Sequence, residues 1–591
     1  LSITANEIKI TADSVGYESN AIVNYGVTKL TANGDISATA TGTTNGMNRA
    51  LYSVGTNDPE LSNFELSTDG IITLYAGGNA SSGTSAIYAL NHTEDTFTLN
   101  GSSISVTAEN GSGSAYGIYA QDSDVDVTAD YSSTVKSSAY GLFSYSGANL
   151  SNIDVTSSSN YIEAGSRALY SSGADSNITL TASALTQEDQ SGRNTVLSQN
   201  YGLSTQNSGK ISLIADNENY IKAETYGSRA ESGEISLQSK INTIISGKYG
   251  LRTQNSGKIN LIADKENSIK GSDYGVYVDS GEILLKSENG INRVESPNAT
   301  AIRTIGANSV VTIDTTSQDT SSIKGTNYLV ADTAYWAEGG ELKLKAVEGN
   351  YLDVINNGLF VDQSGIALLE VSNGVNRIES GALTETNGIT SGNGQAIYVT
   401  ANGLATLNSL NGNNEILGYI RTYKGDSSKI ALTASNNLIS STNTYTVSAT
   451  NGSISLHANG TGTGNSGNNF IYSKYANGYG EGLAIRALSQ GSVYITAQET
   501  NSIFGAISSK NEGSSVSVDG KTNFVKSFAV ISNAGNLNNA TDDKFKDNRV
   551  ISALYAEGKD AQISLTGEQN YLSTFADSSV HTDLERVVWA Y

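Results

Sequence analysis

One stretch of sequence decides the fold because it occurs twice: residues 201–216 read YGLSTQNSGKISLIAD, and residues 249–264 read YGLRTQNSGKINLIAD. Diverged copies begin at Tyr226 (YGSRAESGEISL) and at Tyr274 (YGVYVDSGEILL). The repeating unit is therefore about 24 residues long. A period of this size is typical of one supersecondary unit stacked on copies of itself.

Each unit contains three short runs in which alternate residues share one character. In the unit that starts at Tyr201 the alternating sets are Tyr201, Leu203 and Thr205, then Ile211, Leu213 and Ala215, then Asn219 and Ile221. Alternation with a period of two indicates β-strands, and Gly, Ser, Asn and Asp mark the turns between them. The gaps are filled by poor helix formers, and three strands in about 24 residues leave no room for a crossover helix.

Each strand must then pair in parallel with its counterpart in the next unit, about 4.8 Å away. The sequence therefore predicts an all-β fold, a parallel β-helix (β-solenoid) with three strands per coil and roughly 24 coils of about 24 residues. Crossover connections between parallel strands favour a right-handed coil.

Asparagine recurs two residues before an aliphatic residue, in the pattern N-x-[IVL]. The residues that follow this pattern are Asn160, Asn219, Asn242, Asn267, Asn292, Asn350, Asn376, Asn414, Asn501, Asn523 and Asn570. Asn tolerates turn conformations and carries both a donor and an acceptor, so a stacked column of Asn can hydrogen-bond its own turn and its neighbours. We therefore expect a structural ladder. The Tyr residues of the YG pairs, at 116, 140, 201, 226, 249 and 274, are expected to stack in the same way.

No shift in composition separates a second domain, so residues 1–591 are predicted to be one continuous solenoid. Stretched spacing predicts loop insertions near residues 187–200, 318–334, 380–395, 459–482 and 534–550. The first residues, LSITA, resemble the second strand of a coil, and the last residues resemble a first strand. We therefore expect the chain to be a fragment of a longer solenoid.

Composition restricts the possible partners. The formal net charge of −23 makes an acidic surface that repels phosphate backbones and anionic lipid, so nucleic acid is excluded as a partner. No apolar run approaches the roughly 18 residues of a spanning helix, which argues against direct membrane insertion. The absence of Cys excludes disulfides and thiolate metal sites, and we expect no metal site and no cofactor.

The best candidate for a binding surface is an outward row on the first strand of each coil, at the residue after the inward aliphatic. Read coil by coil, the row is Tyr52, Tyr88, Tyr119, Phe143, Tyr170, Ser204, Ser228, Arg252, Tyr277, Arg303, Trp336, Phe360, Tyr398, Arg421, Arg486, Tyr555 and Trp589. Aromatic residues and Arg are typical of interfaces, although aromatic pairs also stabilise a sheet without any partner. A second candidate is the 459–482 insertion, whose Phe470, Tyr472, Tyr475 and Tyr479 lie among small residues, as in binding loops.

The repeated [YA]-[GA]-[LIV]-x-[AST] and G-x-I-x-L-x-[AS] strands, the N-x-[IVL] corner and the Cys-free acidic surface resemble the passenger region of Gram-negative autotransporter adhesins (type V secretion). The resemblance implies a β-helical cell-surface adhesin that is anchored to the outer membrane through a region not in this chain. It also implies virulence-related adherence, coaggregation or biofilm formation, with a host-cell or bacterial surface protein or glycan, or a second copy, as partner. Two-partner exoproteins related to filamentous haemagglutinin have a similar pattern, so the secretion route stays open.

Catalytic motifs are scarce. His92, His457 and His581 lie far apart in unlike contexts, and no Ser/His/Asp arrangement is evident. Asp122, Asp124 and Asp126 resemble the opening of a calcium-binding EF-hand loop, but Val127 stands where that loop needs Gly, so an acidic strand face is the better interpretation. We expect no enzyme. The alternatives are a structural stalk that displays a distal domain, or a polysaccharide-degrading β-helix enzyme.

Overall fold

The computed structural model describes residues 1–591 except 56–62, 93–96, 112, 186–190, 289, 316–324, 387, 444, 461–466, 474–482, 530–550, 577–584 and 591. The chain divides into two compact units, unit 1 (Leu1–Ser287) and unit 2 (Glu288–Tyr591). Every regular element in the described residues is a β-strand. Within each unit the strands form three columns of parallel pairs, which we name columns A, B and C in the order of the YG, G-x-I and N-x-I runs.

In unit 1 the three columns contain most of the strands, and the short β9 (Asn79–Ala80) pairs with the end of β5 (Ile36–Thr44). Column A of unit 1 contains β3 (Ser19–Asn24), β6 (Met47–Val54), β10 (Gly83–Leu90), β12 (Ala115–Gln121), β14 (Tyr140–Tyr145), β17 (Arg167–Ser172), β20 (Tyr201–Gln206), β23 (Tyr226–Glu231), β25 (Tyr249–Gln254) and β27 (Tyr274–Val278). Column B contains β1 (Ser2–Ala5), β4 (Thr28–Ala32), β7 (Phe64–Thr68), β15 (Ser151–Ser157), β18 (Ser176–Ala182), β21 (Lys210–Ala215) and β28 (Gly281–Ser287). Column C contains β2 (Ile8–Val15), β5 (Ile36–Thr44), β8 (Ile71–Ala76), β16 (Ser159–Ala164), β19 (Arg193–Ser198) and β22 (Glu218–Ala223). Strands that run on from column B into column C are β11 (Phe97–Ala108), β13 (Asp124–Ser137), β24 (Glu234–Ser246) and β26 (Gly257–Gly271).

Unit 2 repeats the arrangement, and three of its strands run on from column C into column A: β29 (Ile291–Ile305), β31 (Thr326–Glu338) and β33 (Gly349–Asp362). Column A continues with β38 (Gln395–Thr400), β41 (Tyr419–Tyr423), β44 (Tyr445–Thr450), β47 (Leu483–Leu488), β50 (Ala506–Lys510), β53 (Ile551–Glu557) and β56 (Glu585–Ala590). Column B contains β30 (Ser309–Asp314), β32 (Glu341–Ala346), β34 (Ile366–Val371), β39 (Leu404–Ser409), β42 (Ser428–Ala434), β45 (Gly452–Ala458), β48 (Ser492–Ala497), β51 (Ser515–Asp519) and β54 (Gln562–Thr566). Column C continues with β35 (Val375–Ser380), β40 (Asn413–Leu417), β43 (Asn436–Ser441), β46 (Asn469–Ser473), β49 (Thr500–Phe504), β52 (Thr522–Ala529) and β55 (Gln569–Ala576).

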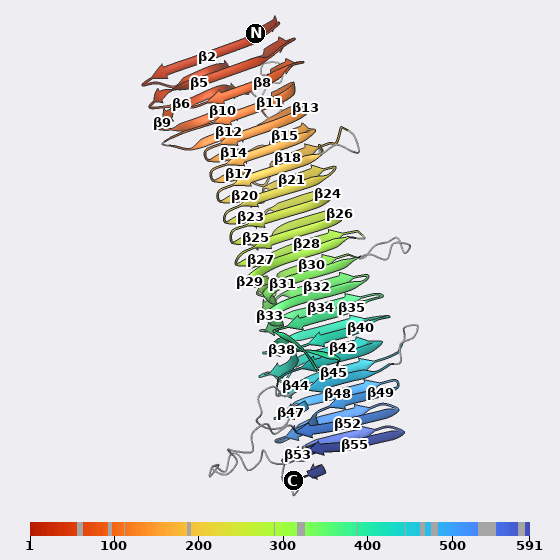
Figure 1. Ribbon diagram of the computed structural model, residues 1–591. Helices are drawn as coiled ribbons and strands as arrows, with labels where there is room; N and C mark the ends of the chain where they lie inside the picture. Colours follow the sequence, from red (N-terminus) through yellow and green to blue (C-terminus); the bar gives the residue numbers. More distant parts are fainter. Residues whose placement is uncertain are drawn as a thin grey trace. The chain divides into compact units, whose positions relative to one another are not determined.

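The register follows the repeats that the sequence shows. Tyr201 of β20 pairs with Tyr226 of β23, and Tyr226 pairs with Tyr249 of β25, all in parallel. In Figure 1 these strands lie one above another with their connecting bends at the same edge. The predicted all-β architecture of parallel strands is confirmed, and it fits a β-solenoid.

The inward residues of the three columns form the core. Ile211 and Leu213 of column B, Ile221 of column C and Leu203 of column A are each at most 1% exposed. Sheets that enclose a core in this way bury the aliphatic residue of every alternating pair, which is why the period of two is so regular in the sequence.

Sterics explain why a glycine follows the tyrosine in the YG pairs. A Cβ atom at Gly227 would lie 2.6 Å from the carbonyl oxygen of Gly250 in the next coil, and it would lie closer still to the γ2 methyl carbon of Ile244. Real Cβ atoms do not approach that closely, so the turn from column C into column A closes tightly only with glycine at this position.

The predicted loop insertions need correction in three places. The 187–200 insertion contains β19, the 318–334 insertion contains the first part of β31, and the 459–482 insertion contains β46. These strands belong to column C or run on from it, so the extra residues are fewer than the spacing suggested. The 380–395 insertion contains an antiparallel hairpin, β36 (Leu383–Thr386) with β37 (Ile389–Gly392). The 534–550 insertion lies outside the described residues.

Candidate functional site

The outward residues at the fourth position of column A form one row in each unit, which we call the column A row. In unit 1 the row is Tyr52, Tyr88, Tyr119, Phe143, Tyr170, Ser204, Arg229, Arg252 and Tyr277. In unit 2 it is Arg303, Trp336, Phe360, Tyr398, Arg421, Ser448, Arg486, Ser508 and Tyr555. The backbone of Trp589 pairs with that of Tyr555 at the same position. The register thus brings the predicted residues together within each unit.

One member of the predicted row is wrong. Ser228 pairs with Leu203 and Leu251 at the inward position and is fully buried. The outward residue of that coil is Arg229, which pairs with Ser204 and Arg252. The error arose because this coil has Ser228 at the inward position, where the neighbouring coils have Leu. The outward residue was identified as the one after the inward aliphatic residue, and this coil has no such aliphatic residue.

The rings of the unit 1 row contact one another along the column. Tyr88 and Tyr119 stack with centroids 4.6 Å apart, and Phe143 and Tyr170 stack at 4.7 Å. All these side chains are half-buried, and burial is the main cause that raises the pKa of the Tyr88 and Tyr119 hydroxyls. The row is therefore a preformed surface of neutral rings rather than a set of independent side chains.

The Tyr residues of the YG pairs form a second stack beside the row in unit 1, as the sequence predicts. Tyr201, Tyr226 and Tyr249 are nearly parallel, with centroids 4.8 and 5.1 Å apart. The guanidinium of Arg252 lies 5.3 Å from the Tyr249 ring, and it donates a hydrogen bond to the Tyr226 hydroxyl at 2.9 Å. Such contacts fix both the rings and the arginines.

The unit 2 row has the same chemistry with larger rings. Trp336 meets Phe360 edge-on at 5.7 Å, and Phe360 lies 5.2 Å from Tyr398. The guanidinium of Arg303 lies 4.7 Å from the Trp336 ring and forms an ion pair with Glu338 at 2.8 Å.

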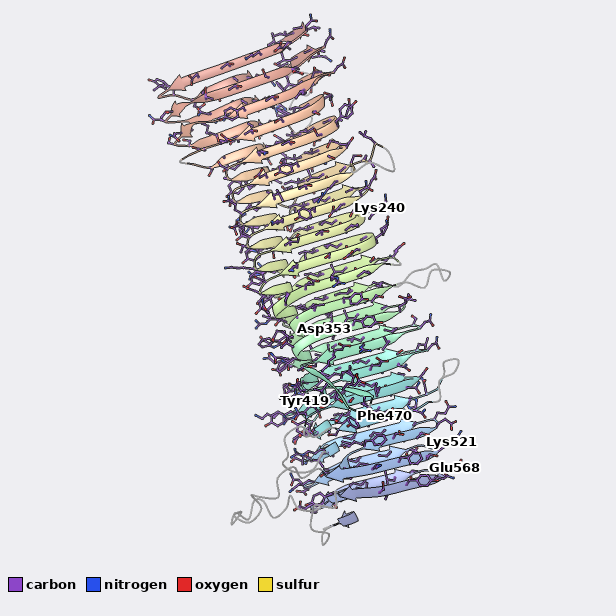
Figure 2. The ribbon with its side chains drawn as sticks, viewed as in Figure 1. Lys240, Asp353, Tyr419, Phe470, Lys521 and Glu568 are labelled. Atoms are coloured by element: carbon purple, nitrogen blue, oxygen red, sulfur yellow. The ribbon has the colours of Figure 1, made fainter. Side chains whose placement is uncertain are left out.

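The structure describes only part of the 459–482 insertion that the sequence predicts as a binding loop. Tyr472 lies in β46 and is 7% exposed, and its ring centroid lies 6.4 Å from that of Phe504. Phe470 is half-buried on the outward face of the same strand, where Figure 2 labels it, and its ring lies 5.2 Å from Phe504. Tyr475 and Tyr479 lie outside the described residues.

The predicted asparagine ladder is a continuous chain of amide hydrogen bonds within each unit. In unit 1 it runs through Asn160, Asn194, Asn219, Asn242 and Asn267, with Nδ2 to Oδ1 distances of 2.8 to 2.9 Å. In unit 2 it runs through Asn292, Asn327, Asn350, Asn376, Asn414, Asn437, Asn469, Asn501, Asn523 and Asn570. The buried amides also donate to backbone carbonyls, so the ladder satisfies polar groups that the turns would otherwise leave unpaired.

Four rungs of the ladder were missed from the sequence: Asn194, Asn327, Asn437 and Asn469. Each one obeys N-x-[IVL], for example Asn194-Thr-Val196 and Asn469-Phe-Ile471. The signal was therefore present in the sequence. Three of the four fall inside segments that were interpreted as insertions.

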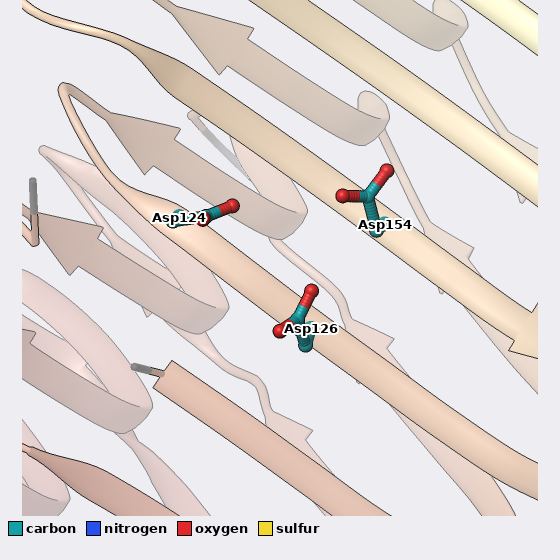
Figure 3. Close-up of side chains that lie close together, drawn as sticks. All are labelled: Asp124, Asp126 and Asp154. Carbon is teal, nitrogen blue, oxygen red and sulfur yellow. The ribbon is translucent and has the colours of Figure 1, made fainter. Parts of the chain in front are cut away.

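A cluster of three carboxyl groups lies on the outer face of column B (Figure 3). Asp124 and Asp126 are on β13 and Asp154 is on the adjacent β15, and their nearest oxygens lie within 4.8 Å of one another. Burial raises the pKa of Asp126, and the negative charges of Asp124 and Asp154 raise it further. Asp122 does not join this cluster, because its Oδ1 accepts hydrogen bonds from the backbone N–H groups of Gly147, Ala148 and Asn149. Oxygen ligands of this kind suit hard cations, but exposed acidic groups also gather without one.

Among the residues that the structure describes, no helix is long and apolar enough to cross a membrane. No protein-family model, no curated protein and no solved structure matches the chain.

Proposed function

We propose that this protein is a nonenzymatic cell-surface adhesin that holds its partner through the column A row. The wider proposal keeps the right-handed solenoid of roughly 24 coils, the resemblance to autotransporter passengers, and attachment to the outer membrane through a region not in this chain.

The observation that carries the proposal is the contact between rings along two stretches of the row. From Tyr52 to Tyr170 in unit 1 and from Trp336 to Tyr398 in unit 2, every coil presents a large ring at this position, and each ring contacts the next. Elsewhere the buried Ser204, Ser448 and Ser508 interrupt the row. Tyr, Trp and Arg contribute most of the energy in protein interfaces. Tyr and Trp bring a large contact area with little loss of side-chain freedom, and Arg brings directed hydrogen bonds and ion pairs. A row of individually weak contacts gains avidity when many engage at once.

The negative net charge of the chain restricts the classes of partner that it can bind. With a net charge of −23, the chain disfavours nucleic acid and other polyanions at long range. The partner is a neutral or basic surface protein, a glycan, or a second copy of this chain that meets the row through its rings. Adherence to host cells, coaggregation or biofilm formation would follow from any of the three.

The test is a bead assay with purified protein. Beads coated with the full chain should aggregate or adhere to target cells, and the triple change of Trp336, Phe360 and Tyr398 to Ser should weaken adhesion at least tenfold. The matched control replaces Tyr328, Tyr351 and Phe504 by Ser, because these are half-buried aromatics facing outward on column C of the same unit. Both variants should keep the β-sheet circular dichroism spectrum. Full adhesion by the row variant would mean that this segment is a stalk.

A further inference from the structure

A groove follows the corner where column C passes into column A in unit 1. Its volume is about 1130 Å³, and its lining residues come from seven consecutive coils between Gly42 and Glu224. At the interstrand spacing of a sheet, the groove is about 29 Å long. A groove of this length that runs across successive coils has the shape of a site for a linear polymer.

The floor of the groove is small and the wall is polar. The buried floor positions are Ser137, Ala164, Ser198 and Ala223, in register from coil to coil. The wall positions beside them are Lys136, Glu163, Leu197 and Lys222, also in register. The small floor residues leave an open space, and the longer side chains of the wall border that space on one side.

The coils approach one another closely beside the floor, at Gly165. A Cβ atom at Gly165 would collide with the carbonyl oxygen of Ser138 in the preceding coil. The groove is therefore a consequence of how closely the coils approach at this corner.

The charges of the groove are balanced. Lys136 and Glu163 form an ion pair at 3.3 Å across adjacent coils, and the remaining charged lining residues are Lys222, Glu109 and Glu224. Two ammonium groups against three carboxylates give no excess of positive charge, so a polyanion is not attracted. The excess of one negative charge is too small to select a polycation.

The apolar content is equally informative. Leu197 is the largest aliphatic side chain of the lining, and no aromatic ring is part of it. A peptide bound in a groove needs pockets for apolar anchors or an unpaired strand edge, and the neighbouring strands of column C are paired on both sides. Hydroxyl, amide and paired charged groups, by contrast, can exchange hydrogen bonds with a ligand rich in hydroxyl groups.

The repeat of the coils matches such a ligand. Three of the four wall positions carry a charged group, and Leu197 is the apolar exception. Successive wall positions lie about 4.8 Å apart, which is close to the length of a pyranose ring.

We propose that this corner groove of unit 1 binds a linear neutral polysaccharide with its chain parallel to the coil axis. The site goes beyond the adhesion proposed for the column A row, because it uses different residues and recognises hydroxyl groups instead of presenting rings.

The test is calorimetric titration of the full chain with cellohexaose, maltohexaose, xylohexaose and mannohexaose. At least one hexasaccharide should bind, and it should bind at least ten times more tightly than the trisaccharide of the same sugar, since the longer chain engages more coils. Ser138→Trp and Gln199→Trp fill the groove from exposed positions, so each should weaken binding at least tenfold.

The matched control is Ser272→Trp, an exposed serine at the same corner of a later coil outside the groove, which should leave binding unchanged. Failure of all four hexasaccharides to bind overturns the proposal, as does binding that survives both groove variants. If heparin or polylysine binds the parent chain and no longer binds the Ser138→Trp variant, the assignment of a neutral ligand is overturned. The triple change in the unit 2 row should not alter the titration, so failure here and failure of the adhesion proposal are distinguishable.

Discussion

At the scale of the residue, a buried asparagine of the ladder serves two coils at once. Asn242 Nδ2 donates to Asn267 Oδ1 and to the Ile262 carbonyl, and its Oδ1 accepts from Asn219 and Ser239, all at 2.9 Å. Both ends of the amide are therefore satisfied by different coils. An ionised Asp has no donor and a Ser hydroxyl has one donor hydrogen, so neither could make the two donor and two acceptor contacts of this amide.

Asn242→Ala should lower the free energy of unfolding by about 2–4 kcal/mol, because it leaves several buried polar groups without partners. The measurement is denaturant unfolding combined with hydrogen exchange, which should show the loss of protection within the neighbouring coils, as expected where stability is nearest-neighbour. Asn260→Ala, which removes one hydrogen bond from a half-buried outward asparagine, is the control and should cost less than 1 kcal/mol. Equal effects of the two changes would contradict the role of the ladder.

His92 makes unit 1 sensitive to acid. The side chain is fully buried, it is 2.8 Å from the Ser53 hydroxyl, and desolvation lowers its pKa from 6.5 to about 4. The neutral form therefore stabilises the fold above pH 6.5, and that stability is lost as the pH falls from 6.5 through 4, to a total of about 3 kcal/mol.

Unfolding curves between pH 7 and pH 4 measure this directly. His92→Gln should flatten the decline of stability over that window. The exposed His457, replaced in the same way, should leave the decline unchanged. A wild-type stability that does not fall between pH 6.5 and pH 4 would refute the burial argument.

At the scale of the element, the start of each column A strand combines a required glycine with a tolerant neighbour. Gly227→Ala should cost about 1–3 kcal/mol, because the added methyl group has no space against Gly250 and Ile244. Ser228→Ala at the next position should be neutral or stabilising, because the buried Ser228 hydroxyl has no hydrogen-bond partner among the described residues. Thermal melts of the two variants give the comparison, and the opposite order would contradict the steric account.

The acidic cluster on column B predicts a pH effect of opposite sign to that of His92. Because the pKa of Asp126 is raised in the fold, its ionisation destabilises unit 1 as the pH rises above the ordinary range of a carboxyl group. Asp126→Asn should therefore raise stability at pH 7 by about 0.5 kcal/mol after solvent screening, and the gain should vanish near pH 3. Asp264→Asn, at an exposed position, should show no such pH-dependent gain.

The period of two and the period of about 24 residues were sufficient to predict the strand columns, because each inward position of a solenoid repeats the same packing problem. The failures occurred where that repetition is hidden. Ser228 replaces the usual aliphatic residue, so the inward and outward positions were exchanged. Asn194, Asn327 and Asn469 follow longer connections, and fixed spacing counted their strands as loops.

The groove could not be predicted from the sequence. Lys136, Glu163, Leu197 and Lys222 share no sequence motif, and only the register between strands places them on one wall. The burial of Tyr472 could not be predicted either. The composition of the surrounding segment resembles a loop, but Asn469 accepts a hydrogen bond from Asn437 of the ladder, and the strand that contains Tyr472 therefore belongs to column C.

At the scale of the whole molecule, repetition of the coil governs both stability and the proposed adhesion. Stability is a sum of contacts between neighbouring coils. In the proposed function, binding is a sum of contacts between a partner and successive positions of the column A row. A substitution at one coil should therefore weaken adhesion only in part, and the fold-losses caused by substitutions at several coils should multiply.

The most direct test of this claim is a graded series in the bead assay: Trp336→Ser, then Trp336→Ser with Phe360→Ser, then the triple change that adds Tyr398→Ser. The account predicts that adhesion falls stepwise with each replacement, while the circular dichroism spectrum stays that of the parent chain. Adhesion that is unchanged through the whole series would contradict the account, and so would complete loss at the first step with no further change, which would indicate a single site in place of a row.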